Sequence, residues 1–144
     1  MAKVRQVSIF LENRAGTFVE IAGLLEQAGI NIRAVTVADT TRFGILRLIV
    51  DQPERCAQVL REQDYTVSIT DVIAVGVADV PGGLGRVARM LTENGVNIDY
   101  MYAFISHCTS DACVILRVGD PEFAEKLLSD HGVTMFTEKE VYEL

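Results

Sequence analysis

A short pattern occurs twice in this chain, and the two copies are a domain's length apart. In the first copy an apolar segment runs into Gly16, and an amphipathic segment then ends at Gly29. In the second copy the same features lead to Gly82 and then to Gly95. Gly82 follows Gly16 by 66 residues, and Gly95 follows Gly29 by the same interval. Repetition at this period predicts two similar structural units.

The first copy contains a segment with the periodicity of a β-strand, followed by one with the periodicity of an α-helix. Residues 5–11 alternate apolar with polar side chains, which predicts a half-buried strand. Residues 17–28 carry apolar side chains at helical spacing. Thr17 and Glu20 have the spacing of a capping box, which would begin this helix, and Gly29 is expected to end it.

The rest of the first copy completes a repeat unit. Strands are predicted at 32–38, 44–50 and 65–72, with the second of these central because it is almost continuously apolar. Pro53 suits the first position of an intervening helix. The order is therefore β-α-β-β-α-β.

The second copy repeats this order. Its strands are predicted at 73–77, 98–106 and 113–118, and its helices at 84–94 and from the cap Asp120 onward. The order is that of a ferredoxin-like unit, an antiparallel sheet with two helices on one face. We therefore predict an α+β protein of two repeats, residues 1–71 and 72–144. The tail from Val133 is expected to add one or two short strands, and Glu140–Tyr142 to reach a sheet edge.

Composition limits the classes of function. The net charge of −7 argues against a nucleic-acid binder that relies on phosphate contacts. With 49% hydrophobic residues the chain can bury a core. It shows no secretory signal and no apolar run long enough to cross a membrane, so we expect a cytoplasmic protein.

Side chains suited to catalysis or metal binding are few. The only histidines are His107 and His131, and no Ser/His/Asp set or phosphate-binding loop motif accompanies them. Cys113 alternates with apolar neighbours and is expected in the core. Together with His107 and Cys108 it could also be drawn as a metal ligand, which leaves a metal-responsive module as an alternative. We otherwise expect no enzyme activity, no cofactor and no metal.

The repeated loops are the strongest candidates for a binding site. A glycine between a strand and a helix lets a ligand approach the backbone, and the helix start favours an anion such as a carboxylate. Asp79, which stands where the first copy has Asn13, is the candidate partner for an ammonium group. The asparagines just beyond each helix supply donors and acceptors. The candidate ligand-binding residues are Asn13, Gly16, Thr17, Phe18, Asn31, Ile32, Asp79, Gly82, Gly83, Leu84, Asn97 and Ile98. The alternative is that the glycines only form turns and caps.

The ordered set of motifs resembles the tandem ACT-domain proteins, which are small regulatory modules that sense amino acids. The segments that carry the resemblance are Ser8–Gly16, Gly29–Arg33, Asp79–Leu84 and Asn97–Tyr102. The resemblance implies a βαββαβ fold, side-by-side pairing of sheets, and small ligands at the interface between ACT units. The first copy departs from the pattern at Ala15, where the second copy has Pro81, so the two sites can differ in affinity.

These observations favour a non-catalytic regulatory protein that binds a small ligand, an amino acid, at ACT–ACT interfaces. A homodimer or a partner enzyme is the expected assembly. The alternative is an interaction module that docks on a partner enzyme through its sheet edges and binds no small ligand.

Overall fold

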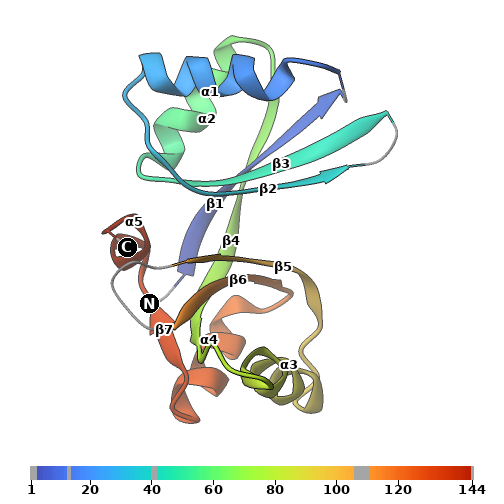
Figure 1. The fold of residues 1–144 in the computed structure, drawn as a ribbon, viewed down its shortest axis with the longest axis vertical. Coiled ribbons are helices and arrows are strands. Elements are labelled where there is room, and N and C mark those ends of the chain that lie inside the picture. Colours follow the sequence, from blue (N-terminus) through green and yellow to red (C-terminus); the bar gives the residue numbers. More distant parts are fainter. Residues whose placement is uncertain (1–2, 13, 40–41, 106–110, 144) are drawn as a thin grey trace. The chain divides into compact units, whose positions relative to one another are not determined.

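The computed structural model divides the chain into two compact units, and it describes residues 3–12, 14–39, 42–105 and 111–143. The N-terminal unit is Arg5–Thr70. The C-terminal unit contains residues 3 and 4 and the described residues from Asp71 onward. Each unit has one copy of the repeated order of strands and helices (Figure 1).

The N-terminal unit is a sheet with two helices on one face (Figure 1). Its elements are β1 (Lys3–Glu12), α1 (Thr17–Gln27), β2 (Ile32–Asp39), β3 (Phe43–Val50), α2 (Pro53–Glu62) and the first half of β4 (Thr66–Val77). The strand order is β2-β3-β1-β4, with β3 antiparallel to both of its neighbours. The prediction that the strand at 44–50 is central is confirmed.

The C-terminal unit repeats this arrangement. The second half of β4 is followed by α3 (Gly83–Glu93), β5 (Ile98–Ile105), β6 (Ala112–Val118), α4 (Pro121–Asp130), β7 (Thr134–Phe136) and α5 (Glu138–Glu143). The strand order is β5-β6-β4-β7, with antiparallel pairing throughout. The predicted α+β class with two ferredoxin-like repeats is therefore confirmed.

Strand registers fix which residues correspond between the repeats. Phe10 of β1 pairs with Ile45 of β3, and Gly76 of β4 pairs with Cys113 of β6. The first members of these pairs differ by 66 in number, and the second members by 68. Corresponding residues of the two repeats are thus 66 apart before the β2–β3 hairpin and its counterpart β5–β6, and 68 apart after them.

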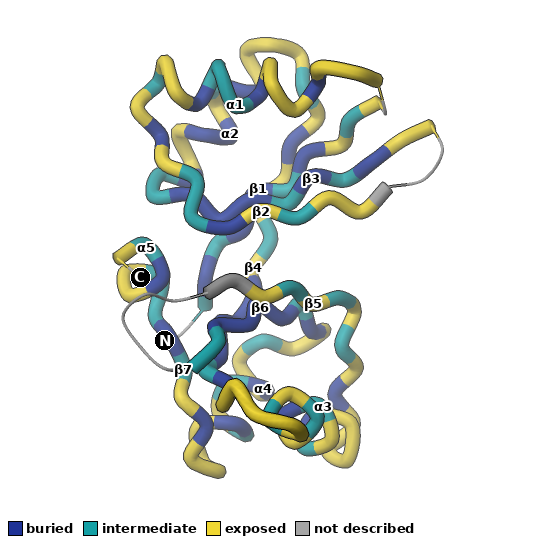
Figure 2. Tube along the Cα trace, in the orientation of Figure 1, coloured by how far each residue is buried: buried dark blue, intermediate teal, exposed yellow. Residues whose placement is uncertain are grey.

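Each unit has its own hydrophobic core between the sheet and its helices (Figure 2). Strand and helix residues that point inward are buried, and each buried valine, leucine or isoleucine side chain contributes roughly 1.5–3 kcal/mol relative to exposure. In the N-terminal unit they include Val7, Ile9, Ile21, Leu25, Leu46, Leu48, Cys56 and Leu60. In the C-terminal unit they include Ile73, Val75, Val87, Leu91, Val114, Leu116, Ala124 and Leu128.

The ends of most helices follow the sequence signals. Asp120 caps α4, because its carboxylate accepts a hydrogen bond of 3.1 Å from the backbone N–H of Phe123. Beyond the helix ends Gly29 and Gly132 have φ of +70° and +79°. Asp64, which corresponds to Gly132, has φ of +66°, a conformation that aspartate tolerates.

Two expectations about local structure are wrong. Thr17 does not cap α1, because Gly16 occupies the cap in a left-handed conformation and makes Thr17 the first helical residue. The Thr17 hydroxyl donates instead to the carbonyl of Arg14, at 3.1 Å.

The second wrong expectation concerns the tail. Of the one or two short strands predicted from Val133 onward, the described residues contain one, Thr134–Phe136. Residues 140–142, predicted to reach a sheet edge, belong instead to helix α5. A capping box that the sequence analysis missed explains the helix. Thr137 Oγ1 accepts from Glu140 N at 3.2 Å, and Glu140 Oε1 accepts from Thr137 N at 3.1 Å.

Candidate functional site

The loop before the first helix of each repeat has the same hydrogen bonds in both units. Arg14 N donates to Glu12 O at 2.9 Å, and Val80 N donates to Ala78 O at the same distance. One turn later Thr17 N donates to the Arg14 carbonyl at 3.4 Å. Its counterpart Gly83 donates to the Val80 carbonyl at 3.0 Å. The two loops are therefore one structure used twice.

Glycine is needed at the helix cap in both loops. Gly16 has φ of +85° and Gly82 has φ of +83°, a region that L-residues with a side chain rarely adopt. This conformation directs the chain from the strand into the helix. The prediction that both glycines form tight turns is confirmed; ligand contact at these residues stays a prediction.

Gly83 is required for a different reason. A Cβ atom at this position would lie 2.1 Å from the carbonyl oxygen of Ala78, so only glycine permits this close backbone approach. The N-terminal loop has Thr17 at the corresponding position. The second loop is therefore more tightly closed on its strand than the first.

A pocket of about 500 Å³ opens beside this second loop. It lies at the end of β4, the start of α3 and the turn that enters β7. Its lining residues are Gly76, Val77, Ala78, Val80, Pro81, Gly82, Gly83, Arg86, Val87, Arg89, Asp111, Gly132, Val133 and Thr134. The volume falls within the range of small-molecule sites.

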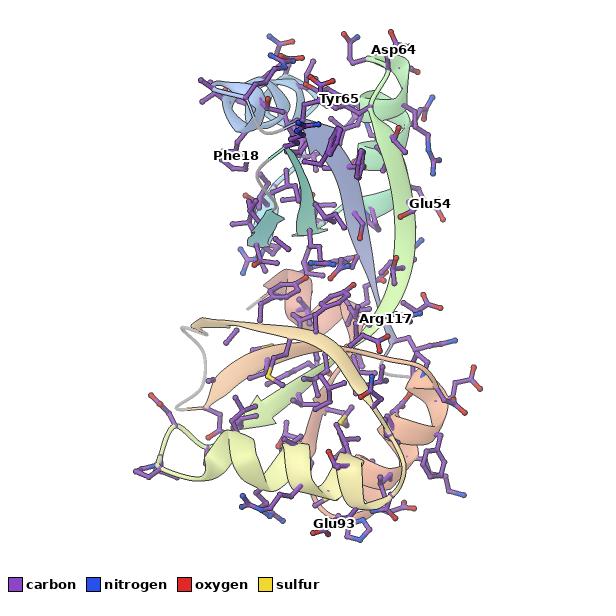
Figure 3. The ribbon with its side chains drawn as sticks, turned by 90° about the vertical axis from the view of Figure 1, so that its right-hand side faces the viewer. Phe18, Glu54, Asp64, Tyr65, Glu93 and Arg117 are labelled. Carbon is purple, nitrogen blue, oxygen red and sulfur yellow. The ribbon has the colours of Figure 1, made fainter. Side chains whose placement is uncertain are left out.

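A second pocket, of about 370 Å³, occupies the corresponding place in the N-terminal unit. Its lining residues are Phe10, Leu11, Glu12, Arg14, Thr17, Glu20, Phe43, Gln63, Asp64, Tyr65 and Thr66. Ten of them correspond to lining residues of the first pocket, at offsets of 66 or 68. Figure 3 shows Asp64 and Tyr65 at the same end of the unit as Phe18.

Side chains of the N-terminal unit contact one another across its pocket. The Tyr65 hydroxyl donates to Glu20 Oε1 at 2.5 Å, and Arg14 Nη2 lies 3.7 Å from Glu20 Oε2. Burial, followed by this hydrogen bond, raises the pKa of Tyr65 to about 12. Nearby, the rings of Phe10 and Phe43 stack with their centroids 5.3 Å apart.

The predicted site residues fall into two groups at opposite ends of the helices. Asn31 and Ile32 follow the end of α1, whereas Gly16 precedes its start. The 11 residues of α1 span about 16 Å, so one unit does not bring both groups into one pocket. The same holds for Asn97 and Ile98 relative to α3.

The asparagines themselves have local partners or lie near other pockets. The backbone N–H of Asn31 donates to Asp51 Oδ1 at 3.0 Å. The side chain of Asn97 donates to Asp99 Oδ1 at 3.0 Å. Asn97 also lines a separate pocket of about 390 Å³, between the ends of α3 and the start of α4.

The remaining predicted residues are placed as follows. Asn13 lies outside the described residues. Asp79 is exposed and does not line the pocket, whereas Asp111 does. Phe18 and Leu84 hold corresponding positions on the first helical turn, and both remain exposed, at 44% and 40%.

Sequence reasoning missed the charged residues that line the pockets. Glu20 was assigned to a cap, and its counterpart Arg86 received no role. Arg89, which lies three residues further along α3, was also missed. The offset of 66 that aligned the glycines also pairs Glu20 with Arg86, so the charge reversal was readable from the repeat.

The cysteines in the described part of the chain are buried, and they belong to no metal-binding cluster there. Cys56 and Cys113 are buried free thiols, and burial raises the pKa of each to about 12. The core position predicted for Cys113 is confirmed. No cluster of three metal-ligating side chains occurs among the described residues; His107 and Cys108 lie outside them. No described helix is both long enough and apolar enough to span a membrane.

Comparisons with known proteins agree with this geometry. The family model for an ACT domain pair matches residues 2–144. A crystal structure of protein BT0572 from Bacteroides thetaiotaomicron is 34% identical, covers 99% of this chain and 98% of its own, and has a TM-score of 0.92. A search of curated proteins found no match.

A more distant likeness extends to the ligand-free regulatory subunit of aspartate kinase from Thermus thermophilus. That structure is 15% identical, covers 89% of this chain and 90% of its own, and has a TM-score of 0.66, which shows a shared fold. The family model and the BT0572 structure cover almost the whole chain. The chain belongs to the ACT domain family, as a pair of ACT domains.

Proposed function

We propose that this chain is a non-catalytic regulatory protein that binds an amino acid. The observation that carries the proposal is the pocket beside the loop and helix start, which recurs at corresponding positions in both units. The proposed repeats are residues 1–71 and 72–144. The regulatory name of the Thermus thermophilus subunit supports the proposal only as an analogy, because the shared fold does not fix function.

The pocket of the C-terminal unit offers groups for both ends of an amino acid. The start of α3, where Gly82 and Gly83 line the pocket, carries a partial positive charge that favours a carboxylate. Asp111 lines the same pocket and is the proposed partner of the ammonium group, whereas Asp79, which the sequence suggested for that role, lies in the adjoining loop and does not line the pocket.

We further propose that a second ACT unit completes the site. Asn31 and Asn97 lie at the opposite helix ends from the glycine loops, so one unit cannot offer both groups to one ligand. An interface with a second copy of the chain would allow it. Regulation then requires that the ligand bind one packing of the units more tightly than another.

A thermal-denaturation screen of the purified chain against the twenty amino acids tests the proposal. A ligand at a hundredfold excess over Kd stabilises the folded state by about 2.7 kcal/mol, which raises Tm by roughly 5–10 °C. Asp111→Ala should weaken binding because it removes the proposed partner of the ammonium group, and Asp79→Ala should weaken it less. A flat screen with all twenty would contradict amino-acid binding.

A second candidate is an interaction module that docks on a partner enzyme. One observation favours it: β2 lies at the end of the strand order, and its Val35 and Val37 are 48% and 54% exposed. An edge strand can pair with a strand of another protein. Val35→Lys with Val37→Lys should abolish recovery of the partner enzyme in a pull-down, and retained recovery would exclude this edge.

A further inference from the structure

The two corresponding pockets differ in the sign of their charge. Glu20 and Arg86 occupy the same position, on the first turn after the glycine cap of their helices. Two further carboxylates of the N-terminal pocket, Glu12 and Asp64, correspond to the uncharged Ala78 and Gly132, whereas Arg14 and Phe43 correspond to Val80 and Asp111. Three carboxylates and one guanidinium therefore line the N-terminal pocket, and two guanidiniums and one carboxylate line the C-terminal pocket, among the described residues.

Bulky side chains of the N-terminal pocket are also absent from its counterpart. Phe10 corresponds to Gly76, and Tyr65 corresponds to Val133. The C-terminal pocket is accordingly larger, about 500 Å³ against about 370 Å³.

Arg89 lies back over the first turn of its helix. A Cβ atom built on Gly85 would lie 3.1 Å from Arg89 Nη1, so the guanidinium covers the glycine. In the N-terminal repeat the corresponding residues are Val19 and Gly23, which can form no such contact. Arg86 and Arg89 stand three residues apart and so project from one face of α3.

This arrangement concentrates positive charge at the pocket. Within the described part of the chain, neither Arg86 nor Arg89 has an ion pair or a side-chain hydrogen bond. Both guanidiniums lie near a helix start, whose partial charge is also positive. A bound anion would relieve this repulsion, and guanidinium groups match the geometry of a carboxylate.

The N-terminal pocket lacks this capacity. Glu20 accepts the Tyr65 hydroxyl at 2.5 Å and has Arg14 at 3.7 Å. Arg14, the one cation among the described lining residues of that pocket, therefore already faces a carboxylate of the same unit. An incoming carboxylate would also meet the charges of Glu12 and Asp64.

We propose that the C-terminal repeat binds an acidic amino acid, with Arg86 and Arg89 holding its side-chain carboxylate, and that the N-terminal repeat has no such site. The inference rests on the proposed amino-acid binding and adds the ligand class and the stoichiometry. The α-carboxylate and ammonium groups keep the partners assigned above.

Isothermal titration calorimetry of the full chain tests this inference. The probes are L-glutamate and L-aspartate, their neutral analogues L-glutamine and L-asparagine, the other amino acids, and inorganic phosphate. One acidic amino acid should bind with one site per chain, at least tenfold more tightly than its amide and than phosphate. Losing one charge-assisted pair corresponds to a tenfold or larger increase in Kd.

Matched variants locate the site. Arg86→Gln and Arg89→Gln should each weaken binding at least tenfold, and both side chains are exposed, so the fold should be retained with an unchanged circular dichroism spectrum. Lys126→Gln removes an exposed cation of the same unit that does not line this pocket, and it should leave Kd unchanged. The inference would be overturned if the double variant Arg86→Gln/Arg89→Gln bound the ligand as tightly as the unaltered protein. Two equal sites per chain would also overturn it.

The probes separate this inference from the broader proposal. Preferential binding of a neutral amino acid would overturn the acidic ligand class while supporting amino-acid binding. Phosphate binding as tight as that of the acidic amino acid would reduce the site to a simple anion site, which also overturns the class. If none of the twenty amino acids binds, the proposed function itself fails.

Discussion

The hydroxyl of Tyr65 donates a 2.5 Å hydrogen bond to Glu20, whereas the corresponding residues of the second repeat, Val133 and Arg86, cannot form this contact. The two repeats thus share one backbone fold but have different side-chain chemistry at their pockets. In the N-terminal repeat the side chains of Tyr65 and Glu20 contact each other. In the C-terminal repeat Arg86 and Arg89 line an open pocket.

Removing the Tyr65 hydroxyl should therefore destabilise the N-terminal repeat modestly. Tyr65→Phe is expected to cost about 1 kcal/mol in the free energy of unfolding, since a hydrogen bond to a partly exposed carboxylate is lost. Urea denaturation at neutral pH measures this cost. A double-mutant cycle with Glu20→Ala isolates the energy of this contact from other effects of the substitutions; a coupling energy below about 0.3 kcal/mol would show that the contact is not stabilising.

The same residue predicts a pH dependence. Because the pKa of folded Tyr65 is about 12, above the ordinary value of 10, its contribution is fully present below pH 10. It should be lost as the pH rises from 10 through 12. Difference spectroscopy of tyrosinate formation, with Tyr65→Phe as the reference, should reveal one late-titrating tyrosine; an ordinary titration curve would contradict the assignment.

Gly83 should be among the least replaceable residues of the candidate site. Gly83→Ala puts a methyl group against the Ala78 carbonyl, and we expect a loss of about 1–3 kcal/mol as the loop shifts. Gly119→Ala is the control, because no atom lies within 4 Å of the added carbon there. Equal denaturation midpoints for the two variants would mean that the close approach carries no cost.

The final helix depends on its capping box. Thr137→Ala removes the acceptor for Glu140 N, and we expect a cost of about 1 kcal/mol together with faster hydrogen exchange in α5. Lys139→Ala changes an exposed residue of the same helix and should leave exchange unchanged. Fully buried Val141 ties this helix to the protein, so protection unaltered by Thr137→Ala would argue that packing alone holds it.

The buried thiols should be unreactive in the native protein. With pKa values raised to about 12, Cys56 and Cys113 carry almost no thiolate at pH 8. Alkylation followed by peptide mapping should modify both only after denaturation. Rapid native labelling of either peptide would contradict its buried position.

The sequence predicted the architecture well because the same periodicities occur twice. Alternation marked the strands, helical spacing marked α1 to α4, and the positive-φ residues marked their ends. The capping of α1 was mispredicted because Gly16 takes the cap that the Thr17–Glu20 spacing suggested. Helix α5 was missed because 6 residues are too few to show a period, although Thr137 and Glu140 carried its signal.

The site was predicted only in part, since its position and its chemistry have different origins. Glycines at a strand-to-helix junction mark the loop directly in the sequence. The lining by Arg86, Asp111 and Val133 depends on three segments that meet only in the folded unit. Comparing each residue with its counterpart in the other repeat would have exposed the reversal from Glu20 to Arg86.

Strand β4 has a consequence for how such a gene can change. Val67 belongs to the first core, and Ile73 and Val75 to the second, yet all three lie on a single uninterrupted strand at odd-numbered positions. Within the second unit, inserting one residue between Ile73 and Val75 would turn one of these two side chains to the face of the strand away from the core, because side chains alternate along a strand. Inserting two residues there would keep both side chains on the same face.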